Sequence, residues 1–216
     1  SAQTAAGGVA LRDAVSLVRN RGRYMQEAVP VGTGSMAAIL GMPAEEVSQI
    51  CSDVSDDGVV EPANLNGAGQ VVIAGHKVAV EKACELAKSR GARRILNLPV
   101  SAPFHCSLMK PAEARLKHDL ATVKFSRLMV PLVNNVDAKL VTDGEDSRDS
   151  LVRQVCSSVR WEESVQLLSK LGVRRFIEIG PGKILSSLVR KIVRNADTMS
   201  VGCPESAERV SEVCVV

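Results

Sequence analysis

One histidine of this sequence occupies a position from which a general base could act. His105 lies in the run 96–111, which reads L-N-L-P-V-S-A-P-F-H-C-S-L-M-K-P and leaves a short apolar strand. Pro99 and Pro103 fix φ and push the residues before them towards extended conformations, so this connector is stiff. A stiff connector can hold an imidazole at a set position and angle, as general-base catalysis requires. The alternative is a loop histidine without chemistry.

Arg21 is the second residue in an unusual position. From residue 11 to residue 28 the pattern is that of a helix with an apolar stripe along Leu11, Ala14, Val15, Val18 and Met25. Arg21 falls on the flank of this stripe, whereas the neighbouring arginines face the opposite side. A guanidinium there needs an anionic partner, and its planar fork suits a substrate carboxylate. An internal salt bridge, or a side chain that reaches water, would satisfy it as well.

Acyl transfer would also require a nucleophile. The parts needed are a Ser or Cys on a strand-to-helix elbow, an oxyanion hole and a base oriented by a third group. The sequence contains no G-x-S-x-G elbow, and Ser35 begins a predicted strand instead of ending one. Cys106 directly follows His105, and neighbours in an extended segment point to opposite sides. The residues alone therefore offer a base and an orphan arginine, but no nucleophile.

The elements that must position these residues belong to two parts. Residues 31–101 show the order β-α-β-β-α-β, with strands at 35–40, 59–66, 70–74 and 93–100 and helices at 43–54 and 76–91. This order is the split βαβ, ferredoxin-like arrangement. Its last strand enters the His105 connector and Arg21 precedes its first strand. It therefore reads as a small subdomain inserted into a larger α/β subdomain of residues 1–30 and 102–216, and a cleft between two such bodies is a common ligand site.

The remainder of the larger subdomain is predicted in less detail. We expect helices at 112–123, 147–158 and 161–171, and strands at 129–136 and 174–179. Gln154 lies on the second of these helices. The turn 180–183, G-P-G-K, lacks the spacing of a phosphate-binding loop. It is better interpreted as a strand-to-helix turn, although the helix N-terminus could face an anion.

Composition narrows the class of protein. A chain of 216 residues that is 45% hydrophobic and 24% charged is typical of a soluble globular protein, and no apolar run is long enough to span a membrane. Aromatic residues make up only 2%, which disfavours a single-stranded nucleic-acid platform. Six scattered cysteines without metal-type spacing predict reduced thiols, no metal site and a cytoplasmic protein. The net charge of +3 suits an acidic protein partner or a phosphorylated small molecule.

Several segments, in order, resemble malonyl-CoA:acyl carrier protein transacylases. The resemblance lies in R-G-R-Y-M-Q-E-A-V-P-V-G-T-G-S-M-A-A-I-L-G (21–41), N-L-N-G-A-G-Q-V-V-I-A-G (64–75), the His105 run, P-L-V-N-N-V-D-A-K (131–139), L-V-R-Q (151–154) and E-I-G-P-G-K-I-L (178–185). It covers the chain to about residue 195. This family transfers a malonyl group from coenzyme A to the phosphopantetheine thiol of acyl carrier protein in fatty acid biosynthesis, through an acyl-serine intermediate.

The resemblance implies a role for each matching residue. His105 matches the catalytic histidine, Gln154 the glutamine whose backbone carbonyl orients it, and Arg21 the arginine that pairs with the malonyl carboxylate. Met25 would line the acyl pocket, and Phe104 resembles the form associated with malonyl units. The expected partners are malonyl-CoA as substrate and acyl carrier protein. Neither cofactor nor metal is expected, nor nucleic acid or membrane, and the protein would be a monomer.

The resemblance also implies a missing part. Residues 1–4 resemble the segment that follows the family's G-H-S-L-G elbow, so we expect the nucleophilic serine to lie upstream of this chain. The large subdomain, similar to an α/β hydrolase, would then be incomplete here. Two alternatives stay open: a module that binds a carrier protein or a CoA thioester without turnover, and a ferredoxin-like protein that binds nucleic acid. The basic pairs at 93–94, 174–175 and 190–191 would dock an acidic carrier or are solvated surface charge.

Overall fold

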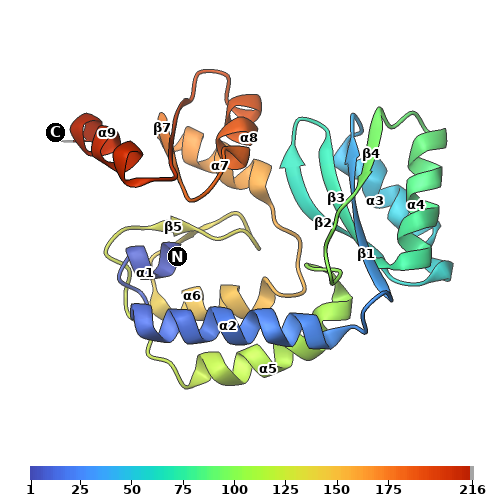
Figure 1. Cartoon of the computed structure of the whole chain (residues 1–216), viewed down its shortest axis with the longest axis horizontal. Helices are drawn as coiled ribbons and strands as arrows, with labels where there is room; N and C mark the ends of the chain where they lie inside the picture. Colours follow the sequence, from blue (N-terminus) through green and yellow to red (C-terminus); the bar gives the residue numbers. More distant parts are fainter. Residues whose placement is uncertain (215–216) are drawn as a thin grey trace. The chain divides into compact units, whose positions relative to one another are not determined.

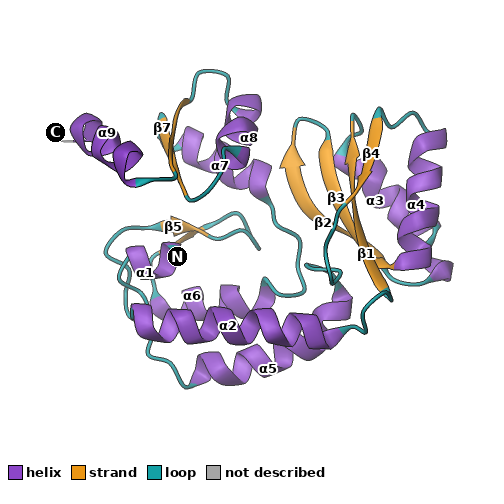
Figure 2. Cartoon of the chain, viewed as in Figure 1, coloured by secondary structure: helices purple, strands orange, loops and turns teal. Residues whose placement is uncertain are grey.

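The structure is a computed structural model that describes residues 1–214, and the chain forms two compact units, Ser1–Trp161 and Glu162–Val216. Figure 1 follows the chain from its N-terminus and Figure 2 distinguishes its helices and strands. The first unit contains α1 (Ala2–Ala5), α2 (Leu11–Ala28), β1 (Gly34–Leu40), α3 (Ala44–Asp53), η1 (Ser55–Asp57), β2 (Val60–Gly67), β3 (Gln70–His76), α4 (Lys77–Ser89), β4 (Arg94–Asn97), η2 (Ser107–Met109), α5 (Lys110–Ala121), β5 (Leu132–Val133), β6 (Leu140–Val141) and α6 (Gly144–Arg153). The second contains α7 (Trp161–Lys170, which begins at the last residue of the first unit), β7 (Arg175–Ile179), α8 (Ile184–Ile192), β8 (Asp197–Val201) and α9 (Pro204–Cys214). No helix among these described residues is both long and apolar enough to cross a membrane.

Residues 34–97 form a four-stranded sheet in the order β2-β3-β1-β4, in which every neighbouring pair is antiparallel. The order of strands and helices along the chain is the predicted one. β1 lies at the centre, because it pairs with both β3 and β4. β2 is an edge strand of this sheet, so the edge that faces away from β3 is open to other segments of the chain.

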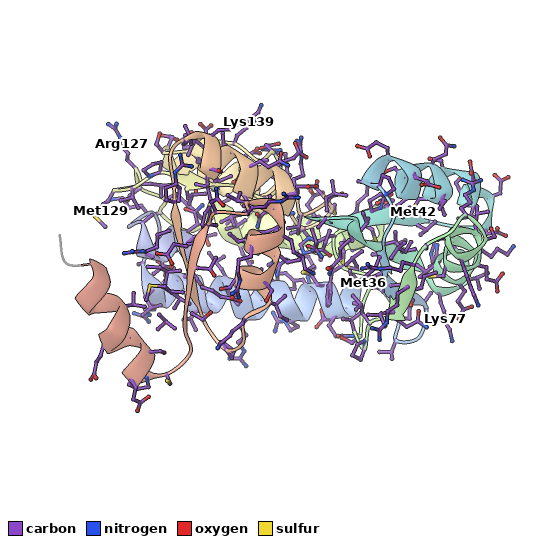
Figure 3. All side chains as sticks on the ribbon, turned by 90° about the horizontal axis from the view of Figure 1, so that it is seen from above. Met36, Met42, Lys77, Arg127, Met129 and Lys139 are labelled. Carbon is purple, nitrogen blue, oxygen red and sulfur yellow. The ribbon has the colours of Figure 1, made fainter. Side chains whose placement is uncertain are left out.

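Both faces of this sheet are buried, which explains why β1 reads as a continuous apolar run. Ala37 and Ile39 belong to the core formed with α3 and α4. Met36 and Ala38 point to the opposite face, since side chains alternate along a strand, and they pack in a second core with Cys106 of the His105 connector. Met42 belongs to the helix-side core, and Figure 3 labels it together with Met36. The sheet therefore carries the connector on the face that its own helices leave free.

The helices of the first unit pack mainly through α2 and α5, which lie side by side in Figure 1. Tyr24 joins them: its hydroxyl donates a hydrogen bond to Asp119 at 2.9 Å, and the Asn20 amide donates to the same carboxylate oxygen at 2.8 Å. The guanidinium of Arg115 lies 3.9 Å from the centroid of the Tyr24 ring. These contacts fix the position of α2 along α5, and they therefore fix the position of Arg21, which α2 carries.

Replacing Tyr24 by phenylalanine is expected to lower the free energy of unfolding by about 1 kcal/mol, because one partly buried hydrogen bond is lost while the ring remains. Thermal or urea unfolding of the full chain measures this loss. Ser16→Ala is the matched control, because it removes an exposed hydroxyl from the same helix and should change stability by less than about 0.5 kcal/mol. Equal stability of Tyr24→Phe and the unmodified chain would show that the hydroxyl does not contribute.

The predicted apolar stripe of α2 is wrong in its first half. Leu11, Val15 and Val18 are 68%, 62% and 64% exposed, while Tyr24 and Met25 are buried. The reason is that α2 packs on α5 and η2 through the residues of its second half. Arg21 lies between the exposed and the buried stretch, and its own side chain is half-buried.

Two predicted elements differ in extent. The expected strand 129–136 is reduced to the two residues of β5, which pair with β6. Pro131 precedes the strand and lacks an N–H donor, and the side chain of Asn134 accepts hydrogen bonds from the backbone of Asp137 and Lys139, which closes a turn instead. The helix expected at 147–158 is α6, which begins earlier because Asp143 caps it.

Candidate functional site

The His105 connector is held from two sides. Pro103 and Cys106 are fully buried. Phe104 packs against two cores: the one on the sheet face that holds Met36, and the one between α2 and α5 that holds Tyr24, called the helical core below. At Gly34 the start of β1 approaches so closely that an added Cβ would lie 2.4 Å from the Pro103 ring. His105 itself has a φ of 62°, in the left-handed region that non-glycine residues seldom adopt. Its backbone conformation therefore depends on the contacts that surround it.

The imidazole of His105 is oriented by a backbone carbonyl. Its Nδ1 lies 2.9 Å from the carbonyl oxygen of Gln154. A carbonyl oxygen only accepts hydrogen bonds, so Nδ1 carries the proton and Nε2 presents its lone pair. The prediction that Gln154 lies within a helix is wrong, because α6 ends at Arg153 and Gln154 is its C-cap. That position matters chemically, since carbonyls at a helix end lack a partner within the helix and can accept from a side chain.

The end of α6 is itself fixed by hydrogen bonds. The amide of Gln154 donates to the carbonyls of Ser157 and Ser158, at 2.9 and 3.3 Å. Two nitrogens of Arg153 donate to the two carboxylate oxygens of Asp137, each at 2.7 Å. The Gln154 carbonyl, which accepts the hydrogen bond from the imidazole, is thus held by contacts of the residue before it and of its own side chain.

Burial is the main influence on the charge of His105, and it lowers the pKa of the imidazole below its usual value. The hydrogen bond to the Gln154 carbonyl acts in the opposite direction, and the positive charge of Arg21 lowers the pKa further. Burial and the Arg21 charge therefore favour the neutral imidazole, whose Nε2 can take up a proton.

Arg21 faces a cavity of about 260 Å³ that Gln154 also lines. The other side chains around it are mainly apolar, among them Leu17, Leu116 and Phe125. Burial lowers the pKa of the guanidinium, and among the side chains that the structure describes no carboxylate forms an ion pair with it. The internal salt bridge considered for Arg21 is therefore absent from the part of the chain that the structure describes. A desolvated cation without an anionic partner is suited to bind an anionic group in the cavity.

The structure thus brings together three of the five residues singled out by sequence. His105 bonds Gln154, and Arg21 is close enough to influence the imidazole electrostatically. Met25 is only 2% exposed and packs in the core between α2 and α5, and it is not among the residues around this cavity. Phe104 is half-buried and packs into the two cores beside the imidazole.

Sequence reasoning missed Glu61. Its two carboxylate oxygens accept hydrogen bonds from the backbone N–H and the hydroxyl of Ser107, two residues after His105. The only signal was an isolated carboxylate within a predicted strand. Nothing in the sequence indicates that residues 46 positions apart meet.

Neither the 180–183 turn nor the buried thiol beside His105 adds chemistry. The carboxylate of Glu178 accepts from the backbone N–H groups of Leu185 and Ser186, at 3.1 and 2.8 Å, so the N-terminus of α8 already faces an internal anion. Burial raises the pKa of the Cys106 thiol to about 12, which makes it a poor nucleophile. Among the described residues no group of three His, Cys, Asp or Glu side chains could hold a metal ion.

A half-buried imidazole oriented by a backbone carbonyl lies near a guanidinium that no described carboxylate pairs with, on a mixed α/β scaffold. This arrangement is suited to acyl transfer of a carboxylate-bearing group. Comparison with known families agrees with this class. The model of the acyl transferase domain family matches residues 1–204.

The relatives narrow the class further. The malonyl CoA-acyl carrier protein transacylase of Escherichia coli K12 is 46% identical over 213 residues, which cover 99% of this chain and 69% of that protein. The Bacillus subtilis protein of the same name is 49% identical over 209 residues, covering 96% of this chain and 66% of its own length. The chain belongs to the malonyl-CoA:acyl carrier protein transacylase family, a family of acyltransferases of fatty acid biosynthesis. It spans about two thirds of the length of these relatives.

Solved structures show the same fold. The acyl-carrier-protein S-malonyltransferase of Burkholderia pseudomallei superimposes with a TM-score of 0.93 at 49% identity, over 97% of this chain and 68% of that one. A malonyl-transacylase in complex with its type II PKS acyl-carrier protein gives a TM-score of 0.94 at 42% identity, over 97% of this chain and 68% of that one.

Proposed function

We propose that this chain provides the base, the orienting carbonyl and the carboxylate clamp for transfer of a malonyl group from malonyl-CoA to the phosphopantetheine thiol of an acyl carrier protein. The nucleophilic serine would lie upstream of Ser1. The observation that carries the proposal is the half-buried Arg21, which no described carboxylate pairs with and which lies beside the cavity and close to the imidazole of His105. The family membership and the carrier protein bound to one structural relative support the same substrates.

The proposed reaction uses His105 twice. Nε2 removes the proton of the serine hydroxyl as its oxygen attacks the thioester carbonyl, and the resulting imidazolium returns that proton to the sulfur of coenzyme A as the C–S bond breaks. In the second half, Nε2 removes the proton of the carrier thiol, whose sulfur attacks the acyl-serine, and the serine oxygen regains the proton. The Gln154 carbonyl holds the imidazole in the required tautomer throughout. Arg21 would bind the malonyl carboxylate through two parallel hydrogen bonds.

The finer organisation belongs to the same proposal. Residues 31–101 would be the ferredoxin-like small subdomain, and residues 1–30 with 102–216 the part of an α/β-hydrolase-like large subdomain that this chain contains. Phe104 would favour malonyl units, and Met25 would line the acyl pocket once the upstream segment is present. The protein would act in the cytoplasm as a monomer, with no cofactor beyond its substrates.

Mass spectrometry after incubation with malonyl-CoA tests this function. The chain extended by its upstream coding sequence is expected to form a covalent malonyl adduct on a serine and to pass it to holo-acyl carrier protein. This chain alone should form no adduct. Binding of malonyl-CoA by the extended protein without an adduct would favour the non-catalytic binding module, and an adduct on this chain alone would show that a different nucleophile acts.

A further inference from the structure

Glu61 contacts the connector that carries the imidazole. It lies in β2, and one carboxylate oxygen accepts the Ser107 N–H at 2.8 Å while the other accepts the Ser107 hydroxyl at 2.7 Å. Ser107 is the first residue of η2, which continues directly into α5. Hydrogen bonds to a carboxylate are stronger than those between neutral groups, and an anion is favoured at the beginning of a helix. The two bonds therefore fix the chain immediately after His105.

The same strand also holds the segment that follows α6. The Ser158 hydroxyl donates to the carbonyl of Pro62 at 2.5 Å. Val159 exchanges backbone hydrogen bonds with β2, donating to Ala63 at 2.8 Å and accepting from Leu65 at 2.9 Å. These contacts use the open edge of β2. Pro62 lies beside an irregularity in the register with β3, and such irregularities in edge strands tolerate proline.

Consecutive residues of β2 thus hold both partners of the hydrogen bond between His105 and Gln154. Glu61 holds the connector two residues after His105, and Pro62 with its neighbours holds the turn that begins at Gln154. The two partners are 49 residues apart in sequence, so no local structure sets their distance. The left-handed backbone of His105 gives the connector a further need for outside support.

We propose that Glu61 is a positioning residue, whose carboxylate on the edge strand of the small sheet sets the orientation of the His105 imidazole against the Gln154 carbonyl. The catalytic meaning of this role rests on the function proposed above. In this arrangement one strand of the small sheet, β2, holds both the segment that carries the base and the segment that carries its orienting carbonyl. Glu61 itself does not touch the reacting atoms.

Nitrogen-15 NMR of the imidazole in the full chain tests the positioning directly and requires no turnover. In the unmodified chain, His105 should show the two separate resonances of a single neutral tautomer with the proton on Nδ1. Glu61→Ala should move both resonances towards the average of the two tautomers, because the imidazole is no longer held against the carbonyl. Glu61→Gln retains one carbonyl acceptor and should give an intermediate shift, as should Ser107→Ala.

Glu85→Gln is the matched control. It removes a carboxylate from an exposed position on α4, a helix that packs on the same small sheet. The His105 resonances should stay unchanged. The proposal is overturned if the resonances of Glu61→Ala coincide with those of the unmodified chain. If Glu61→Ala does not fold, Glu61→Gln and Ser107→Ala decide in its place, and unmoved resonances in both overturn it.

Kinetics separate this proposal from the proposed function. In the extended protein, Glu61→Ala should lower kcat about tenfold or more while KM for malonyl-CoA changes less than about twofold, since a misplaced base slows the chemistry without weakening the carboxylate clamp. Malonyl transfer together with unmoved His105 resonances in the variants would refute the role of Glu61 alone. Shifted resonances in a protein that transfers no malonyl group would support the positioning and refute the function.

Discussion

Replacing Arg21 by alanine is expected to lower kcat/KM for malonyl-CoA about 100-fold or more, because a half-buried charge pair between the guanidinium and the substrate carboxylate would lose one partner. Acetyl-CoA lacks this carboxylate, so its transfer should persist or rise. The structural reason is that burial disfavours the charged guanidinium and the described residues offer it no carboxylate partner. Substrate carboxylate then replaces the missing hydration, whereas an acetyl group leaves the charge unsatisfied.

The rates of both acyl-CoA substrates, measured side by side in the extended protein, decide this prediction. Arg21→Lys should recover only part of the loss, since an ammonium cannot form the two parallel hydrogen bonds of a guanidinium. Arg19→Ala is the matched control, because it removes an exposed arginine from the same helix and should leave the malonyl-to-acetyl ratio unchanged. An equal loss for malonyl and acetyl transfer in Arg21→Ala would refute the carboxylate clamp.

The local parts of the fold could be predicted from the sequence. The β-α-β-β-α-β order of the small sheet follows from apolar periods and glycine-rich turns that each act within about ten residues. The position of Arg21 on the flank of its helix follows in the same way, although the apolar residues beside it proved to be exposed. What a helix presents to its neighbours depends on which of its faces finds a partner, and that is not a local property.

The contacts that assemble the site could not be predicted from the pattern of residues alone. The hydrogen bond from His105 to Gln154 joins a connector to a helix end that sequence reasoning placed inside a longer helix. The contact of Glu61 with Ser107 crosses from a strand to a helix start. Each depends on a backbone group left free at the end of an element, and element ends are the part of a fold that periodicity determines least. The resemblance to a known family named Gln154, but it did not indicate Glu61.

Replacing His105 by alanine is expected to lower kcat/KM about 1000-fold or more, because the serine and the carrier thiol would lose their general base in both halves of the reaction. The pH dependence is the sharper observation. Burial places the pKa of His105 below the ordinary imidazole value of about 6.5, so the acidic limb of kcat/KM in the free enzyme should lie below that pH. The fold also favours the neutral form, so His105 contributes stability that is present above the unfolded pKa and lost as pH falls through the folded one.

Two further variants test the pKa of His105 and the group that orients its imidazole. Arg21→Ala removes a positive charge that lowers the His105 pKa, so it should move the acidic limb upward, measured with acetyl-CoA to avoid loss of binding. Gln154→Ala keeps the backbone carbonyl that accepts from Nδ1 and deletes only the amide that holds the following turn, so it should reduce kcat far less than His105→Ala. An acidic limb at or above the ordinary imidazole pKa would contradict a base whose pKa is lowered by its surroundings. A loss in Gln154→Ala as large as in His105→Ala would assign the orienting role to the Gln154 side chain, against the geometry in which its backbone carbonyl bonds the imidazole.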